Sequence, residues 1–91
     1  ADGMACRVPE PNALAIIHRE VDEIVSVSDE EVAQAMRVLF ADTHNVAEGA
    51  GAASLAALLQ QRERWAGQRV GIVLSGGNVD SAMFAQVLSA R

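Results

Sequence analysis

The stretch that most constrains the fold is "RVGIVLSGGNVDS" (residues 69–81), in which an apolar run stops abruptly at two glycines. Residues 69–75 are mostly apolar and of strand length, a pattern typical of a parallel strand that is buried on both faces. Helical periodicity resumes after the glycines, with Asn78 or Asp80 as the candidate N-cap. A buried strand that passes through a short turn into a helix predicts an α/β arrangement of layers.

The remaining stretches predict one more strand and three more helices. Two prolines predict a loop before a short helix over residues 13–21, for which Asn12 is the candidate N-cap. Residues 22–28 have the composition of a strand. A second long helix is predicted to begin near residue 48 or 49 and to end near residue 64.

The clearest helix boundary lies at Ser28. Ser28 and Glu31 have the Ser-x-x-Glu spacing of a capping box, and Val27 and Val32 occupy the positions of a hydrophobic staple. A helix is therefore predicted over about residues 29–41. Its inner face, read from the helical spacing, is Val32, Ala35, Met36, Leu39 and Phe40.

The predicted order of elements is helix, strand, helix, helix, strand, helix. Two strands are too few for a free-standing parallel sheet that is covered on both faces. The predicted fold class is therefore α/β, with residues 1–91 as a fragment of a three-layer parallel-sheet domain of about two strands and four helices. Such an incomplete domain has to complete its sheet with more of the same chain or with a partner chain.

Charge and cysteine content exclude several classes of function. The net charge is −5 and no basic stripe is visible, which argues against nucleic acid and against anionic membrane surfaces as partners. No apolar run reaches the roughly 18–20 residues of a membrane span. Cys6 is the only cysteine, which excludes an internal disulfide and fits a reducing, cytoplasmic compartment. His18 and His44 are too far apart in sequence to indicate a metal centre, so no metal site is predicted.

The Ser-Gly-Gly-Asn turn is the first candidate site. Ligands of open α/β sheets bind beyond the carboxyl ends of the strands, and this turn lies at such an end. Ser75 offers a hydroxyl, and Gly76 and Gly77 let another group approach the backbone. The alternative is a tight turn whose glycines are needed only for positive φ angles, and the two interpretations are evenly balanced on position alone.

The second candidate is "EGAGAA" at residues 48–53, where Glu48 adds a carboxylate to a glycine-rich helix start. As a dinucleotide-binding fingerprint it fails, because it lacks the third glycine and no convincing strand precedes it. Taken alone, this stretch favours close helix packing over ligand binding. A small nucleotide- or phosphate-binding protein is therefore a weak alternative.

Taken together, the stretches "ADGMA", "VDEIVSVSDEEVAQAM", "VAEGAGAASLAALL" and "GIVLSGGNVD" resemble, in order and spacing, the C-terminal part of the catalytic domain of threonine/serine dehydratases. These enzymes depend on pyridoxal 5′-phosphate (PLP), have the tryptophan-synthase-β-like fold and include serine racemase as a relative. The resemblance covers nearly the whole chain. It implies loss of water from L-threonine or L-serine, followed by hydrolysis to a 2-oxo acid and ammonia.

The resemblance also implies roles for single residues. Ser75 matches the serine that hydrogen-bonds the pyridine nitrogen of PLP, and Gly76 and Gly77 match the glycines that shape the turn under the ring. Glu48 matches an acidic residue beside the ring, and Gly49 is its neighbour in that wall.

Three further expectations follow from the resemblance. Asp2 and Gly3 match a segment near the entrance of the active site. The family holds PLP as a Schiff base on a lysine, and this chain contains no lysine, so no catalytic residue is assigned here and the isolated chain is expected to be inactive. The expected partners are an amino-acid substrate and either the rest of the catalytic domain or a homo-oligomer partner. The alternative is a truncated, non-catalytic interaction module that completes its sheet with a partner chain.

Overall fold

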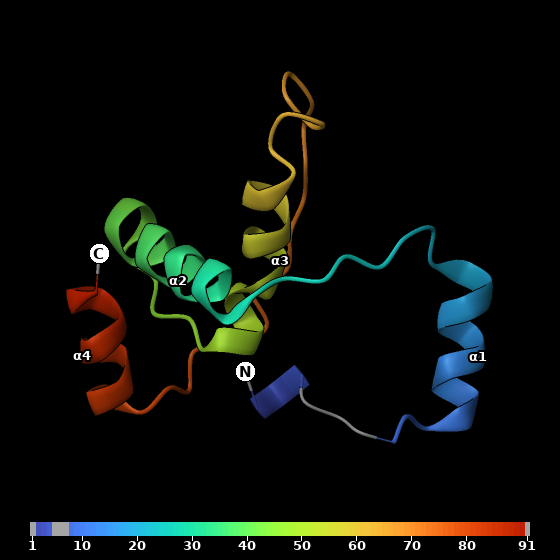
Figure 1. The fold of residues 1–91 in the computed structure, drawn as a ribbon, viewed down its shortest axis with the longest axis horizontal. Helices are drawn as coiled ribbons and strands as arrows, with labels where there is room; N and C mark the ends of the chain where they lie inside the picture. The colour runs from blue at the N-terminus through green and yellow to red at the C-terminus, as the bar shows by residue number, and fades with distance from the viewer. Residues whose placement is uncertain (1, 5–7, 91) are drawn as a thin grey trace.

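The computed structural model describes residues 2–4 and 8–90, and within them the regular elements are all helical (Figure 1). Cys6 lies outside the described residues. A single turn of 3₁₀ helix comes first, and four α-helices follow it. In chain order they are η1 (Asp2–Met4), α1 (Pro11–Glu20), α2 (Asp29–Thr43), α3 (Gly49–Gln60) and α4 (Ser81–Ser89).

Helix α2 confirms the boundary predicted at Ser28. The Ser28 hydroxyl accepts a hydrogen bond from the backbone N–H of Glu31 at 3.1 Å, and the Glu31 carboxylate accepts one from the N–H of Ser28 at 2.8 Å. The capping box therefore satisfies two of the N–H groups that a helix start leaves without partners. The helix extends two residues beyond the predicted end at Ala41 and stops where His44 adopts a left-handed conformation with φ of 58°.

The bounds of α1 and α3 differ from prediction. Asn12 is not the N-cap of α1; the Glu10 carboxylate accepts from the N–H of Ala13 at 2.7 Å instead. Pro11 explains the shift, because its fixed φ suits the first helical position and it has no N–H to satisfy. Helix α3 ends at Gln60 rather than near Arg64, and turns occupy residues 61–67.

The core lies between α2 and α3, with α4 packed on the other side of α2 (Figure 1). Alanines on both helices let the two backbones approach closely. Arg37 of α2 holds α4 in place by donating to the backbone oxygen of Val87 at 3.1 Å. Phe40 and Phe84 join the same two helices edge to face, with ring centroids 5.4 Å apart. The buried cluster consists of Val32, Ala35, Met36, Leu39, Ala47, Ala52 and Ala56.

The predicted α/β fold class is wrong for this structure, because no strand occurs in residues 2–4 and 8–90. Residues 22–28 and 69–75, the two predicted strands, are instead connecting segments that lack a neighbouring strand. Their backbone carbonyls bond to side chains of α3: Gln60 donates to Ser26 and Ser54 donates to Val73. A strand exists only where another strand supplies the ladder of hydrogen bonds, and an apolar run in the sequence cannot show whether that partner is present.

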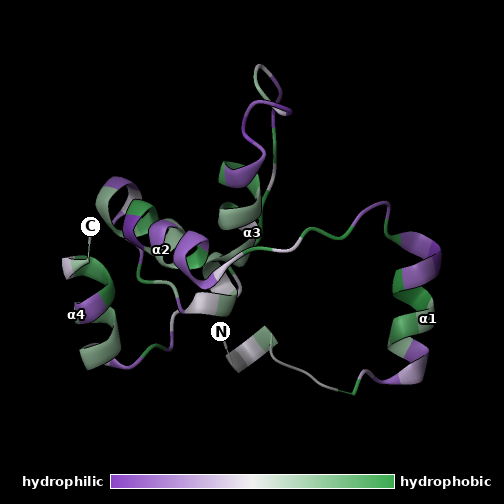
Figure 2. Ribbon diagram, in the orientation of Figure 1, coloured by the Kyte–Doolittle hydropathy of each residue, from purple (hydrophilic) through white to green (hydrophobic). Residues whose placement is uncertain are grey.

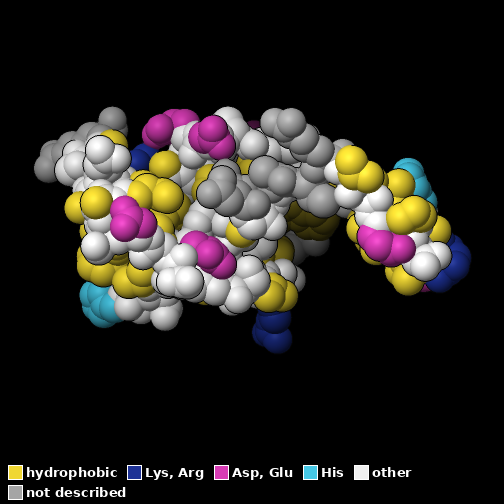
Figure 3. Space-filling view, turned by 90° about the horizontal axis from the view of Figure 1, so that it is seen from below, with side chains coloured by type: hydrophobic (Ala, Val, Ile, Leu, Met, Phe, Trp, Pro, Cys, Tyr) yellow, Lys and Arg dark blue, Asp and Glu magenta, His cyan; other side chains and the backbone are white. Residues whose placement is uncertain are grey.

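Helix α1 stands apart from this core. It contacts none of the other helices in the described part of the chain and has no buried residue. Figure 2 shows hydrophobic residues in the middle of α1, and Figure 3 shows them at its surface. Among the described residues, no helix is both long and apolar enough to cross a membrane.

Candidate functional site

The structure brings the two glycine-rich motifs into direct contact, although 21 residues (54–74) separate them in the sequence. The backbone N–H of Glu48, just before α3, donates to the carbonyl oxygen of Gly76 at 3.1 Å. The Glu48 carboxylate also lies close to Gly76, since a Cβ built on Gly76 would be 2.7 Å from Glu48 Oε1. The Ser-Gly-Gly turn and the start of α3 therefore form one unit.

Missing side chains make this contact possible. A Cβ added to Gly51, in the first turn of α3, would overlap the carbonyl oxygen of Gly76. A Cβ added to Gly77 would overlap the carbonyl oxygen of Val46 in the same way. Gly51 therefore serves close packing between two backbones. The sequence favoured close helix packing for "EGAGAA", and the structure packs Gly51 against the Ser-Gly-Gly turn instead of another helix.

The backbone angles separate the two interpretations of the Ser-Gly-Gly turn. Neither Gly76 nor Gly77 has a positive φ, and Gly67 is the one described glycine that does. The turn therefore does not require glycine for its conformation. Gly77 has to be glycine because the carbonyl oxygen of Val46 lies against it, whereas a Cβ on Gly76 would meet the Glu48 carboxylate, which is the end of a flexible side chain.

Ser75 is exposed at the edge of this unit. Within residues 2–4 and 8–90, its hydroxyl has no hydrogen-bond partner. The Glu48 side chain is half-buried and makes no capping hydrogen bond to α3, although its backbone has the N-cap position. A neutral hydroxyl and a carboxylate thus flank the glycines.

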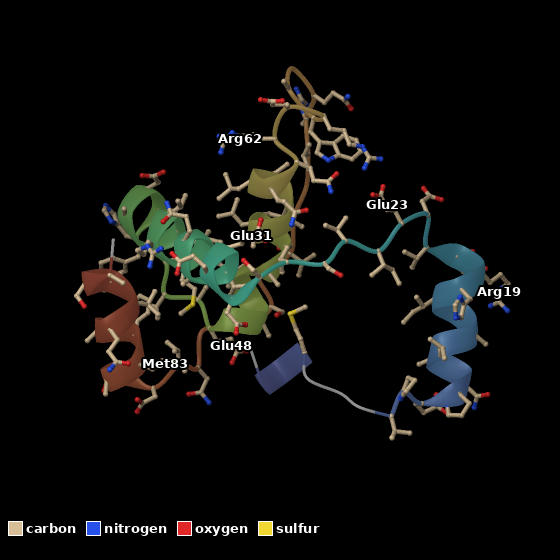
Figure 4. All side chains as sticks on the ribbon, in the orientation of Figure 1. Arg19, Glu23, Glu31, Glu48, Arg62 and Met83 are labelled. Atoms are coloured by element: carbon tan, nitrogen blue, oxygen red, sulfur yellow. The ribbon has the colours of Figure 1, made fainter. Side chains whose placement is uncertain are left out.

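A hollow of about 440 Å³ opens beside Glu48, where the N-terminal ends of α2, α3 and α4 meet. Gly49 lines it, as does Gly3 of η1; a Cβ on Gly3 would be 2.9 Å from the Cβ of Ala50. Figure 4 labels Glu48 and Met83, which reach this hollow from two different elements. Ser75, Gly76 and Gly77 are not part of the described lining. The complete lining is Gly3, Asp29, Val32, Ala33, Met36, Glu48, Gly49, Ala50, Asn78, Val79, Asp80, Met83 and Val87.

Asn78, the last residue of the Ser-Gly-Gly-Asn turn, and Asp80 also line this hollow, although the sequence predicts no ligand contact for either side chain. Asp80, one of the two predicted N-cap candidates, caps α4 by accepting from the N–H of Met83 at 3.0 Å. The signal that links both residues to the site is their position directly after the Ser-Gly-Gly turn. The side chain of Asp2, in contrast, lies outside the described residues.

A larger hollow of about 750 Å³ lies elsewhere, between the start of α2 and the end of α3. It contains no residue of either glycine-rich motif, and its polar side chains bond to one another. Gln60 donates to Glu31 at 3.2 Å and Arg64 donates to Gln61 at 3.1 Å. We therefore place the candidate site at the contact between the motifs. No group of His, Cys, Asp or Glu suited to a metal ion occurs in the part of the chain that the structure describes.

The chain is similar in sequence to a known family of enzymes. The model of the family described as "Pyridoxal-phosphate dependent enzyme" matches residues 1–76. The chain is 39% identical over 89 residues to the L-threonine ammonia-lyase of Thermotoga maritima, an alignment that covers 98% of this chain and 22% of that protein.

Two further relatives are similar to this chain over most of its length. The L-threonine ammonia-lyase of Geobacter sulfurreducens is 46% identical over 80 residues, covering 88% of this chain and 20% of that protein. The serine racemase of Schizosaccharomyces pombe is 37% identical over 89 residues, covering 98% of this chain and 28% of that protein. The chain thus spans between a fifth and just over a quarter of these relatives, and the resemblance to the dehydratases is confirmed. The chain belongs to the family of pyridoxal-phosphate dependent enzymes, whose cofactor is pyridoxal phosphate.

Proposed function

We propose that these 91 residues are the C-terminal segment of the catalytic domain of an ammonia-lyase that converts L-threonine or L-serine to a 2-oxo acid and ammonia. The observation that carries this proposal is the contact between Glu48 and the Ser-Gly-Gly turn. It gathers Ser75, Gly76, Gly77, Glu48 and Gly49 into one region of a chain that belongs to a PLP-dependent family. The names of the L-threonine ammonia-lyases among the relatives support the choice of reaction.

The residues present fit one wall of a PLP site. The Ser75 hydroxyl can both donate and accept a hydrogen bond, so it suits a pyridine nitrogen. When bound, PLP supplies an electron sink to its substrate. A neutral hydroxyl keeps the ring nitrogen protonated to a smaller extent than a carboxylate would. Ser75 therefore favours elimination, in which a leaving group removes the electrons quickly.

These residues do not supply the amine that binds the cofactor. PLP enzymes use a lysine for that purpose, and none of the seven basic residues in the chain is a lysine. We propose that the lysine belongs to a part of the protein outside these 91 residues, and that the isolated segment has no lyase activity.

The proposed partner is the rest of the same catalytic domain. Leu14, Ile17 and Val21 of the α1 region are exposed at helical spacing, and Ile72 and Val73 are exposed in the segment before the turn. The relatives are several times longer than this chain, so the additional length is available to cover these residues. A non-catalytic module that a separate chain covers is the second candidate, and the same exposed residues favour it.

The test is made on a longer protein that carries this segment. We expect it to release 2-oxobutanoate from L-threonine or pyruvate from L-serine. Ser75→Ala should lower that rate roughly 10- to 100-fold, as expected for loss of a hydrogen bond to a charged or polarised group. It should also change the absorption spectrum of the bound cofactor, while the melting temperature stays the same.

The matched control is Ser89→Ala, because the Ser89 hydroxyl donates only to Gln86 within α4. Full activity in Ser75→Ala would contradict the role of this serine. The 91-residue chain, treated with PLP and borohydride, should give no stoichiometric adduct at an internal residue by mass spectrometry. A longer protein that binds no PLP and releases no 2-oxo acid would favour the interaction module.

A further inference from the structure

We propose that Gly51 is a positioning residue, which fixes the place of the Ser75 hydroxyl by letting the Gly76 peptide rest on the first turn of α3. This inference rests on the proposed function for the role of Ser75. The packing on which it depends can be measured in the 91-residue chain without any cofactor. Gly51 itself is buried and is not proposed to touch the cofactor or the substrate.

The steric evidence is specific to the peptide of Gly76. A Cβ on Gly51 would overlap the Gly76 oxygen, and it would lie 3.0 Å from the Gly76 nitrogen and 3.3 Å from the Gly76 carbonyl carbon. All three are backbone atoms, so they cannot turn aside as the end of a flexible side chain can. Any side chain at Gly51 must push the peptide next to Ser75 away from α3.

Two neighbouring contacts leave this peptide little freedom to move elsewhere. The N–H of Glu48 donates to the Gly76 oxygen, so a displacement of that oxygen breaks the hydrogen bond. Gly77 rests against the carbonyl oxygen of Val46, which anchors the next peptide. Gly51, Gly76 and Gly77 thus form a glycine interlock that joins residues 46–51 to the turn.

Helix propensity and the packing of Gly51 against Gly76 predict opposite effects of Gly51→Ala on stability. Alanine favours a helix more than glycine does, so the substitution would stabilise α3 if nothing lay against it. The interlock instead predicts displacement of the turn and loss of stability. Gly71→Ala is the matched control, because a Cβ at Gly71 meets no atom within 4 Å and this residue lies five positions before Gly76.

The first arm of the experiment uses amide hydrogen exchange and NMR on the 91-residue chain. Gly51→Ala should lower the protection of the Glu48 amide at least about tenfold and shift the signals of residues 75–78. Gly71→Ala should leave both unchanged. If Gly51→Ala does not fold, the wild-type chain decides the question. Scalar coupling across the hydrogen bond from Glu48 to Gly76 supports the interlock, and its absence overturns it.

The second arm uses the holoenzyme and the absorption spectrum of its bound cofactor. Gly51→Ala should shift that spectrum in the same direction as Ser75→Ala, and the double variant should shift it no further, because both act through one hydroxyl. Additive shifts would overturn the positioning role. If Ser75→Ala alone leaves the spectrum unchanged, the proposed function fails, while the first arm still decides whether the interlock exists.

Discussion

Helices α1 and α2 have similar local signals and different surroundings. Each is amphipathic, and each begins at a side chain that accepts a hydrogen bond from the backbone, Glu10 for α1 and Ser28 for α2. Helix α2 buries four residues against its neighbours, whereas α1 buries none and contacts no other helix in the described chain. Caps and periodicity therefore form a helix, but they do not determine whether its apolar face finds a partner.

The same difference separates the Ser-Gly-Gly turn from the apolar segment directly before it. Residues 76–77, at the end of one predicted strand, rest on the backbone of residues 46–51. Residues 70–74, immediately before them, expose Val70, Ile72, Val73 and Leu74. Within the described residues, the glycines rest on another part of the backbone, whereas these apolar side chains stay partly exposed.

The largest expected effect contrasts a core residue of α2 with an exposed one of α1. Met36 is 3% exposed and Ile17 is 39% exposed. Met36→Ala should lower the free energy of unfolding by about 2–5 kcal/mol, because it removes buried methylene groups and leaves a cavity. Ile17→Ala should change it by less than about 0.5 kcal/mol. Urea denaturation followed by circular dichroism measures both.

Met36→Leu keeps the core volume and is the control; it should cost less than about 1.5 kcal/mol. If Met36→Ala and Ile17→Ala had equal effects, the core assigned between α2 and α3 would be wrong. Such a result would also remove the contrast between the two helices.

A smaller effect is expected where α2 ends. His44 has φ of 58° there, while α1 ends at Val21 in an extended conformation. His44→Gly should raise the free energy of unfolding by up to about 1 kcal/mol, because glycine adopts the left-handed conformation without a Cβ clash. The gain is partly offset by the greater freedom of glycine in the unfolded chain. Thermal melting followed by circular dichroism measures the change.

Ala41→Gly, one turn earlier in α2, is the matched control. It introduces glycine at a helical position and should cost about 1 kcal/mol. Opposite signs for the two substitutions are the expected result. A loss of stability in His44→Gly would show that the His44 side chain contributes more than its backbone strain costs.

The sequence could predict those features of the fold that depend on residues close together in the chain. The capping box at Ser28 and the cap at Asp80 each involve residues three positions apart, and the structure has both. On the predicted inner face of α2, Val32, Ala35, Met36 and Leu39 are buried, but Phe40 is 39% exposed, so the prediction was wrong for that residue. The strand prediction failed for the opposite reason. Strands depend on distant partners, and an apolar run such as residues 69–75 looks the same with or without one.

The sequence could predict which residues belong to the candidate site, but not how they are arranged in space. Ser75, Gly76, Gly77, Glu48 and Gly49 came from motifs, and the structure brings the two motifs together. The residues next to Gly51 in the sequence do not show why this position needs a glycine. It depends on a peptide 25 residues further along the chain, and only the fold shows that the two touch.

The smallest expected effect is a pH dependence that originates at Glu31. The N–H of Ser28 donates to its carboxylate and holds the pKa of Glu31 below its ordinary value, and the amide of Gln60 acts in the same direction. Because the folded pKa is the lower one, this carboxylate stabilises the fold above the unfolded pKa. That contribution is lost as the pH falls through the folded pKa.

Glu31→Gln removes the titration and keeps a side-chain oxygen at the capping position. The wild-type chain should therefore be the more stable of the two at neutral pH, and the difference should shrink as the solution is acidified below the ordinary pKa of a glutamate. Urea midpoints measured across that acid range check this. Glu10→Gln, at the cap of the isolated α1, is the control and should leave the unfolding of the α2–α3 core unchanged at every pH. A difference between wild type and Glu31→Gln that stays constant with pH would show that the capping box acts through its geometry alone, without the charge.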